Sequence, residues 1–290
     1  MLLNFGGAMK LAVNFSEILV ALLKKYPELP VDFIKVPTIV KFPEGWDQFN
    51  LGSQYRNLLP HIIQDGILSL GNPDNLQQYN KETIQKILEL TKPPHLSTHL
   101  RAGAEYFPEF NEFLHGYDVK LEKALIDRFV NVIKLIQEQI KIPLLVENYP
   151  YYSWWTNYRL GSEPSFINRI CNEADCGFLL DLAHAQVSAW HMKTDILKYL
   201  SLLPLERVKE IHLGGVRQAE YGGLWDAHTA LASDDYQLLQ FILNETKPDI
   251  ITLEYGGFPD RQLNLKGSYE LCPRNNVNEL YEMIYQILSF

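Results

Sequence analysis

Eight short apolar segments alternate with helix-like segments along the chain, and this alternation limits the possible folds more than any other feature. The apolar segments are rich in aliphatic and β-branched residues, and their hydrophobicity is nearly continuous. That pattern is typical of parallel strands that are buried on both faces. The segments span residues 11–15, 31–36, 61–67, 95–100, 142–149, 177–184, 208–215 and 249–256. Eight strands that alternate with helices predict an α/β fold of the (β/α)8 TIM-barrel type.

Helical periodicity fills most of the intervals between these strands. In residues 119–140 the apolar side chains from Leu121 to Ile140 recur every three or four positions and trace one helix face. Further helices are expected at 80–90, 235–244 and 277–288. The segment 37–57 fits the pattern least, because it is rich in aromatic and polar residues. A doubly wound open sheet is the alternative fold, but no glycine-rich phosphate-binding turn follows the first strand, so the barrel is favoured.

The length and composition fit one barrel. The chain has 290 residues, of which 47% are hydrophobic, and barrels of this type typically have about 250 residues. We therefore expect a single TIM-barrel domain over residues 1–290. The chain carries 26 basic and 35 acidic residues, which gives a net charge of −9 without a basic cluster. Such a surface repels phosphate backbones, so no nucleic-acid partner is expected.

Nothing in the sequence points to a membrane or to secretion. No run of about 18 apolar residues is present, so no membrane-spanning helix is expected. The segment 1–15 is too short and too polar for a secretory signal. Cys171, Cys176 and Cys272 do not form the pattern of a disulfide framework and are interpreted as ordinary residues. We therefore expect a cytoplasmic protein.

Histidines and carboxylates interrupt the predicted strands near their C-terminal ends. They are Asp65, His99, Glu147, Asp181, His184, His212 and Glu254, and Asp226 and His228 follow just beyond the seventh strand. In a barrel, the C-terminal ends of the strands and the loops after them form the active-site face. A polar group inside an apolar strand is costly unless it is paired or bound to a metal. The convergence of these residues therefore predicts a metal site.

Most of these residues have a simpler explanation when each is taken alone. His99 fits a hydrogen-bonded core histidine, and Asp181 fits the N-cap of the following helix. Taken alone, His212 and Glu254 fit buried hydrogen-bond networks as well as they fit metal ligands. Glu147 is harder to explain in this way, because a buried glutamate needs a strong partner. Taken together, the set favours metal binding over separate structural roles.

The types of ligand indicate which metals are expected. Imidazole and carboxylate groups without cysteine indicate iron, zinc or manganese. More ligands are present than one ion requires, so two or three ions are expected, and clustered carboxylates would repel one another without them. The aromatic segment 149–155 follows the fifth strand directly, where it would either pack as a loop or line a substrate groove. The remaining histidines, which lack this placement, are expected to have structural roles: His61, His95, His115 and His191.

Five motifs occur in the order and spacing of one barrel family: LLVENYPYY, GFLLDLAHAQVSAW, VKEIHLGG, WDAHTAL and ITLEYGG. They resemble the multinuclear non-haem iron-dependent oxidases, whose best-known member acts in methanobactin biosynthesis. The resemblance spans residues 31–254. It implies a xylose-isomerase-like TIM barrel that holds two or three iron ions. It also implies oxygen-dependent modification of a peptide, often at cysteine, with a partner protein that delivers the peptide.

The resemblance implies a metal-binding role for eight residues: His99, Glu147, Asp181, His184, His212, Asp226, His228 and Glu254. Glu147 and His212 are also the residues expected to be catalytic. His184 stands where many members of the family have asparagine. Two strands depart from the family, because the second reads KVPTIVK in place of a Glu and a His, and the third reads Gln64-Asp65-Gly66 in place of a His-Gly pair. One metal position is therefore expected to be lost or bound by Asp65, and two ions are favoured over three.

Three functions follow from these observations. The first is an iron oxidase or oxygenase that acts on a peptide or a small thiol. The second is a zinc- or manganese-dependent sugar isomerase or epimerase, with Lys35 or Glu147 as the base, or a phosphodiesterase on the same barrel. The third is a non-catalytic binding protein with a degenerate metal site, which the missing ligands in the second and third strands support. The metal content of protein purified without oxygen distinguishes the three.

Overall fold

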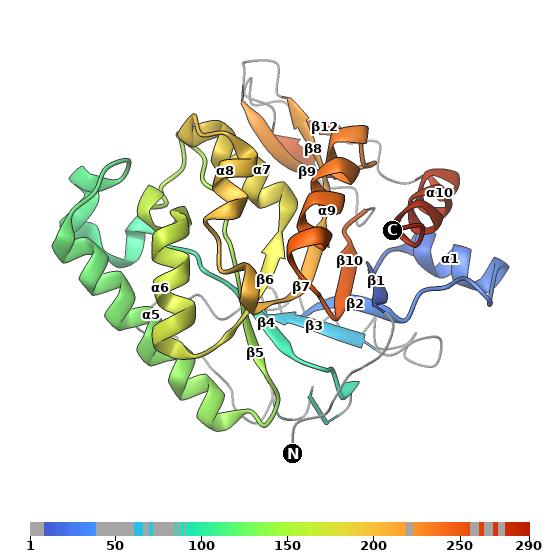
Figure 1. Ribbon diagram of the computed structural model, residues 1–290, viewed down its shortest axis with the longest axis horizontal. Coiled ribbons are helices and arrows are strands. Elements are labelled where there is room, and N and C mark those ends of the chain that lie inside the picture. The colour runs from blue at the N-terminus through green and yellow to red at the C-terminus, as the bar shows by residue number, and fades with distance from the viewer. Residues whose placement is uncertain are drawn as a thin grey trace.

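Eight parallel strands close into a barrel in the computed structural model, in the order β1-β10-β7-β6-β5-β4-β3-β2 (Figure 1). The structure describes residues 9–38, 61–65, 70–71, 85, 88–89, 91–218, 223–255, 261–263, 269–271 and 276–290, with the backbone alone at 37–38, 61–65, 261–263 and 269–271. The barrel strands are β1 (Lys10–Asn14), β2 (Phe33–Thr38), β3 (His61–Asp65), β4 (Leu96–His99), β5 (Leu144–Glu147), β6 (Gly177–Asp181), β7 (Val208–Leu213) and β10 (Ile250–Leu253). Every predicted strand overlaps one of them, which confirms the (β/α)8 fold.

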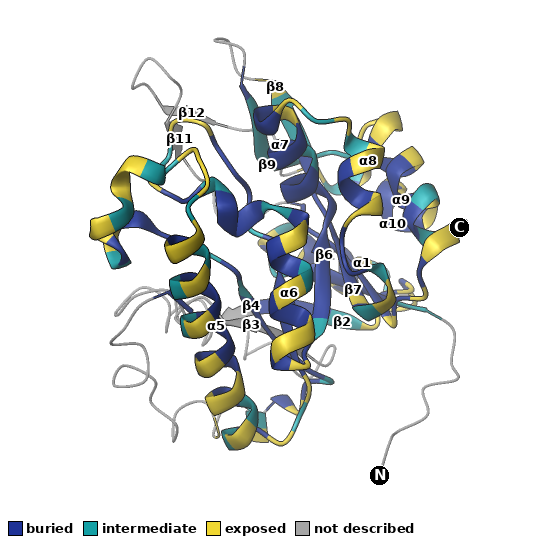
Figure 2. Cartoon of the chain, turned by 60° about the vertical axis from the view of Figure 1, so that its left-hand side comes forward, coloured by how far each residue is buried: buried dark blue, intermediate teal, exposed yellow. Residues whose placement is uncertain are grey.

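Helices surround the barrel, with buried inner faces and exposed outer faces (Figure 2). They are α1 (Glu17–Lys25), α5 (Val119–Gln139), α6 (Pro164–Ala174), α7 (Leu182–Met192), α8 (Ile196–Ser201), α9 (Ser233–Glu245) and α10 (Val277–Ile287), with short 3₁₀ helices η1 (Ala104–Tyr106), η2 (Pro108–Phe113), η3 (Arg159–Ser162) and η4 (Leu205–Arg207). The predicted helices at 119–140, 235–244 and 277–288 are confirmed as α5, α9 and α10. Most of the predicted helix 80–90 and of the segment 37–57 lies outside the described residues. Among the described helices, none combines the length and the apolar character that a bilayer crossing requires.

Helix α5 illustrates how the sequence sets a local element. The side chain of Asp118 accepts hydrogen bonds from the backbone N–H groups of Lys120 and Leu121 at 2.8 and 2.9 Å, which caps the N-terminus of the helix. The apolar face predicted from the periodicity, which includes Leu125 and Phe129, is buried against the barrel. Burial of this stripe, rather than helix propensity alone, fixes the position of α5.

Strand β6 is shorter than predicted, and this moves one site residue. The predicted strand 177–184 ends at Asp181, because the Asp181 Oδ1 atom accepts a hydrogen bond from the backbone N–H of His184 at 2.7 Å and starts helix α7. His184 therefore lies in the first turn of α7 and not on a strand. Asp181 does serve as a helix N-cap, as its simpler explanation predicted, but the cap uses only one of its two oxygen atoms.

Two β-hairpins add to the barrel. Strands β8 (Gly215–Gln218) and β9 (Leu224–Thr229) form one antiparallel pair, and β11 (Arg261–Leu263) and β12 (Tyr269–Leu271) form the other. Asp226 and His228, which follow the seventh predicted strand, both lie on β9, a strand that the sequence did not predict. Strand β9 was not recognised because its sequence, LWDAHT, lacks the continuous apolar run of the barrel strands.

Candidate metal centre

The barrel aligns the polar residues at the strand ends in neighbouring pairs. His99 at the end of β4 is the register partner of Glu147 at the end of β5, and Asp181 at the end of β6 is the register partner of His212 in β7. Glu147, Asp181 and His212 are all nearly fully buried. Because parallel strands end at the same rim of the barrel, their side chains meet there. The rim thus gathers carboxylates and imidazoles in a setting with little water.

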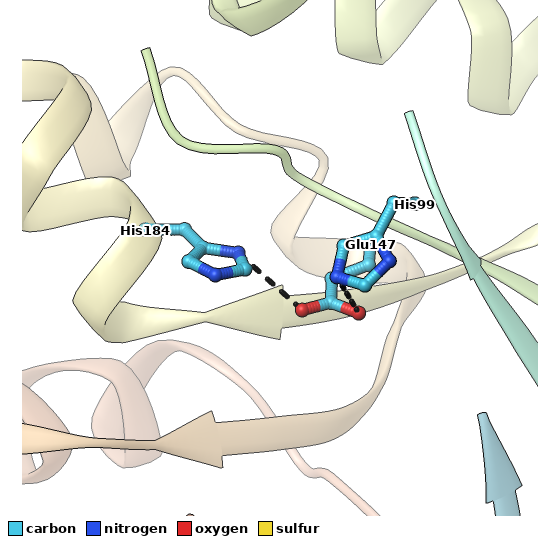
Figure 3. A group of neighbouring side chains, drawn as sticks. All are labelled: His99, Glu147 and His184. Atoms are coloured by element: carbon cyan, nitrogen blue, oxygen red, sulfur yellow. Dashed lines mark ion pairs between the residues drawn. The ribbon is translucent and has the colours of Figure 1, made fainter. Parts of the chain in front are cut away.

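Glu147 lies at the middle of the cluster. Its Oε2 atom is 3.4 Å from His99 Nε2, and its Oε1 atom is 3.4 Å from His184 Nδ1 and 3.6 Å from His212 Nδ1. Figure 3 shows the Glu147 carboxylate between the rings of His99 and His184. One carboxylate therefore contacts three imidazoles that come from β4, α7 and β7.

A second series of contacts continues the cluster across the β9 hairpin. His184 Nε2 is 3.3 Å from Asp226 Oδ2, which is 3.0 Å from His228 Nε2. His228 Nε2 is also 3.3 Å from Glu254 Oε2, and Glu254 Oε1 is 3.5 Å from His212 Nδ1. Glu254 directly follows β10. The structure therefore brings all eight residues of the expected ligand set into one continuous cluster, whereas the side chain of Asp65 lies outside the described part of the chain.

The donor atoms fit a metal ion. In the described part of the chain, two groups of three side chains have ligand atoms within 4.8 Å of one another: His99, Glu147 and His184, and Glu147, Asp181 and His212. Asp181 Oδ2 and His212 Nδ1 are buried, lie 3.8 Å apart and make no hydrogen bond to a described residue. A buried polar atom without a partner is costly. A cation between these two atoms would remove that cost, and imidazole and carboxylate groups suit iron, manganese or zinc.

Hydrogen bonds on the far side of two imidazoles set which nitrogen faces the cluster. His184 Nδ1 lies 2.8 Å from the Asn148 carbonyl oxygen, and a proton donated there leaves the Nε2 lone pair directed towards Asp226. His212 Nε2 lies 3.1 Å from Glu210 Oε1, so the corresponding proton leaves the Nδ1 lone pair directed towards Glu147. If each ring gives up its second proton when a metal ion binds, His184 Nε2 and His212 Nδ1 are therefore the nitrogens that would bind it.

The acid–base properties of the cluster reflect its crowding. Burial, reinforced by nearby carboxylates, raises the pKa of Asp181 to about 7. Burial alone would lower the pKa of His212 and of His228, but the surrounding carboxylates outweigh it and raise these values to about 10 and about 9. At His99 burial prevails, and its pKa falls below the usual value. Without a metal, protons on the imidazoles therefore balance the carboxylates, and a metal cation would displace those protons.

Two buried residues beside the cluster were not predicted as site residues. Glu210 is fully buried, and its carboxylate contacts His212, His95 and Thr252. It lies two positions before His212 on β7, and side chains two apart share one face of a strand, so the sequence carried a signal for this contact. Lys35 on β2 forms an ion pair with Glu254. It was considered only as a base, and its partner lies 219 positions further along the chain.

Of the predicted structural histidines, the three whose side chains are described lie outside the two groups of possible ligands. His95 binds Glu210 beneath the cluster, His115 Nδ1 lies 2.9 Å from the Tyr151 hydroxyl, and His191 Nε2 lies 3.1 Å from the Leu224 carbonyl oxygen. The side chain of His61 and the whole of Cys272 lie outside the described residues. Cys171 and Cys176 are buried free thiols.

The turn into β8 leaves room for the hairpin to approach the cluster. A Cβ atom on Gly214 would lie 3.2 Å from His228 Cδ2, and one on Gly215 would lie 2.5 Å from the Thr229 carbonyl oxygen. His228 itself has a φ of 48°, in the left-handed region that non-glycine residues seldom adopt. The two glycines therefore permit a close approach that holds Asp226 and His228 at the rim.

Aromatic side chains border one side of the cluster. The Tyr149 ring centre is 5.4 Å from that of His99 and 6.2 Å from that of His184. Tyr152 packs against Trp155 at 4.3 Å and against Trp225 at 5.3 Å, so the segment 149–155 is joined to β9. This segment packs as a loop directly beside the candidate ligands.

A comparison with protein families identifies the chain. Residues 16–262 match the family described as RiPP precursor modification enzyme MbnB/TglH/ChrH. The chain belongs to this family. The match covers most of the barrel and confirms the family that the five sequence motifs predicted.

Curated relatives of this MbnB/TglH/ChrH family member extend over most of its length. The UPF0276 protein of Psychromonas ingrahamii is 30% identical over 216 residues, which cover 71% of this chain and 75% of that protein. The UPF0276 protein of Shewanella sediminis is 23% identical over 273 residues, which cover 89% of this chain and 88% of that protein.

Solved structures share the fold of this family member at low sequence identity. A xylose isomerase domain containing protein from Salmonella typhimurium has a TM-score of 0.62 at 14% identity and covers 97% of this chain and 96% of its own. A D-tagatose 3-epimerase-like protein has a TM-score of 0.58 at 12% identity, with coverage of 97% and 98%. These similarities show that the barrel is xylose-isomerase-like, as predicted, and concern the fold alone.

Proposed function

We propose that this chain is a multinuclear non-haem iron enzyme that oxidatively modifies a peptide, with residues 1–290 forming one catalytic domain in the cytoplasm. The observation that carries the proposal is the position of Glu147, within 3.4 to 3.6 Å of three imidazole nitrogens. A buried carboxylate surrounded in this way could act together with these imidazoles as a ligand to metal ions. Family membership supports a peptide precursor as the substrate.

The proposed ligands are the eight clustered residues, which come from the barrel strand ends, helix α7 and the β9 hairpin. Bound iron(II) would supply redox chemistry with oxygen. Glu147 and His212 carry the most weight, because Glu147 belongs to both groups of possible ligands and His212 is fixed by Glu210. Burial of its ring lowers the pKa of His99, which favours the neutral form that can donate a lone pair.

The peptide would reach the cluster beside the aromatic segment. Tyr149 packs against His99 and His184, and Trp154 further out is 40% exposed. Aromatic side chains at such a rim offer an apolar surface for a peptide and limit the access of water to the ligands. We further propose that a partner protein delivers the peptide, and that a small thiol is the alternative substrate. Neither nucleic acid nor a membrane is proposed as a partner.

A zinc- or manganese-dependent isomerase or phosphodiesterase on the same barrel is the second candidate. Its support is the fold shared with the xylose isomerase domain containing protein. The ion pair with Glu254 disfavours Lys35 as its base. Although burial lowers the pKa of Lys35, Glu254 and Glu147 raise it above the usual value, so that the side chain stays an ammonium. A non-catalytic protein with a degenerate site is the third candidate.

Metal analysis of protein purified without oxygen tests the proposal. Two or three equivalents of iron support an iron enzyme, zinc or manganese supports the second candidate, and an absence of metal supports the third. The iron-loaded protein is then incubated with a candidate precursor peptide and oxygen, and the peptide mass is measured. An oxygen-dependent mass change is expected in the presence of iron, and an unmodified peptide from every candidate precursor would contradict the proposal.

A further inference from the structure

Lys35 is a cation built into the candidate metal centre. It lies on β2, is 5% exposed and forms an ion pair with Glu254 Oε1. Strands β10, β1 and β2 are neighbours in the barrel, so Lys35 reaches across β1 to the end of β10. A lysine is seldom buried unless a carboxylate neutralises it, and Glu254, itself 4% exposed, serves that purpose here.

The oxygen atom that Lys35 occupies belongs to the expected ligand cluster. Glu254 Oε1 lies 3.5 Å from His212 Nδ1, the nitrogen that faces the cluster, whereas Glu254 Oε2 is directed towards His228 at 3.3 Å. Of the two oxygens, Oε1 is therefore already bound to a positive charge. A metal ion at the same oxygen would face the ammonium across a short distance in a low-dielectric setting, where like charges repel strongly.

The composition of the two possible ligand groups agrees with the pairing of Glu254 Oε1 with Lys35. Both groups found among the described residues contain Glu147, and neither contains Glu254. Glu147 lies on β5, which β3 and β4 separate from β2 in the closed barrel, and Lys35 pairs with Glu254. Among the described residues, buried atoms of Asp181 and His212 lack a hydrogen-bond partner, whereas the chain itself supplies a cation to Glu254 Oε1.

We propose that Lys35 takes the place of a metal ion beside Glu254 Oε1 and so limits the number of ions that the centre binds. The inference rests on the proposed metal centre and adds a reason for the number of metal ions that the centre binds per chain. Glu254 keeps only Oε2 for a metal shared with Asp226 and His228.

Equilibrium dialysis against manganese(II) tests this inference, with the bound metal counted per chain. Lys35→Met removes the charge at nearly constant length and is expected to bind one equivalent more than the wild type. Lys35→Gln is expected to do the same. Lys123→Met is the control, because Lys123 lies on the exposed face of α5, pairs with Asp127 and should leave the count unchanged.

The outcomes separate the two proposals. No manganese or iron bound to the wild type would contradict the metal centre itself. A wild type that binds metal, together with Lys35 variants that bind the same number of ions, would overturn only the role of Lys35. If Lys35→Met is insoluble, it is expressed with added manganese. Recovery of folded protein in that case supports the inference, since the metal replaces the lost cation, whereas continued failure to fold contradicts it.

Discussion

His212 Nε2 lies 3.1 Å from Glu210 Oε1, and the opposite nitrogen of the same ring, Nδ1, lies 3.6 Å from Glu147 Oε1. Glu210 is held in turn by His95 and by the Thr252 hydroxyl, which donates a hydrogen bond to it. All of these groups are buried inside the barrel. Glu210 therefore orients His212 from outside the ligand cluster, in the manner of the carboxylates that commonly support metal-bound histidines.

Glu210→Ala is expected to weaken metal binding by roughly 10–100-fold, the usual effect of removing such a supporting residue. Glu210→Gln keeps an acceptor for the His212 proton, so it should retain more of the affinity. A manganese titration of both variants, with circular dichroism to verify folding, gives the measurement. Wild-type affinity in a folded Glu210→Ala variant would show that Glu210 does not position His212.

Glu147→Gln is expected to lose most of the bound metal, because it removes the charge shared by both groups of possible ligands. His212→Ala should lower the metal content as well, and both barrels should stay folded. Glu163→Gln is the matched control, since Glu163 pairs with Arg159 away from the cluster. Full metal content in folded Glu147→Gln and His212→Ala proteins would refute the ligand assignment.

The sequence predicted the barrel well because its strands are continuous apolar runs, and it predicted the cluster because the strand ends of a barrel must converge. It predicted β9 poorly, since a hairpin outside the barrel core has no such run, and it assigned His184 to a strand because the helix begins within an apolar segment. The spacing of Glu210 and His212 indicated a shared strand face, but neither the contact of Glu210 with His95 nor that of Lys35 with Glu254 could be predicted from local pattern. The roles of Glu210 and Lys35 depend on contacts between strands far apart in the chain.

The metal-free protein is expected to lose stability as the pH rises from 7 to 10. His212 and His228 have pKa values of about 10 and about 9 in the folded chain, above the usual 6.5. A histidine with a raised pKa contributes its full stability below 6.5 and loses it as the pH passes through the folded value. Bound metal replaces these protons, so the metal-loaded protein should not show the loss.

Thermal unfolding across this pH range, with and without manganese, provides the measurement. The difference in Tm between the two forms should widen as the pH rises. A metal-free Tm that stays constant or increases from pH 7 to 10 would mean that these imidazoles are not held protonated by the carboxylates.

Gly215→Ala is expected to destabilise the protein by about 1–3 kcal/mol, the usual cost of overpacking. Its new Cβ atom would lie 2.5 Å from the Thr229 carbonyl oxygen, and a backbone atom in a paired hairpin cannot easily move away. The displaced hairpin should also lower metal binding by Asp226 and His228. Gly116→Ala is the control, because nothing lies within 4 Å of a Cβ atom there. Equal unfolding temperatures for the two variants would count against the close approach of the Thr229 carbonyl oxygen to Gly215.

Anomalous diffraction at the iron edge, from crystals grown and loaded with iron(II) without oxygen, tests the central claim most directly. Two iron peaks are expected at the rim of the barrel, with Glu147 bound to both and with His99, His184 and His212 among their ligands. Iron bound elsewhere on the protein, or a rim without iron after saturating exposure, would contradict the metal centre. A third fully occupied ion coordinated by Asp65 would contradict the predicted number of two.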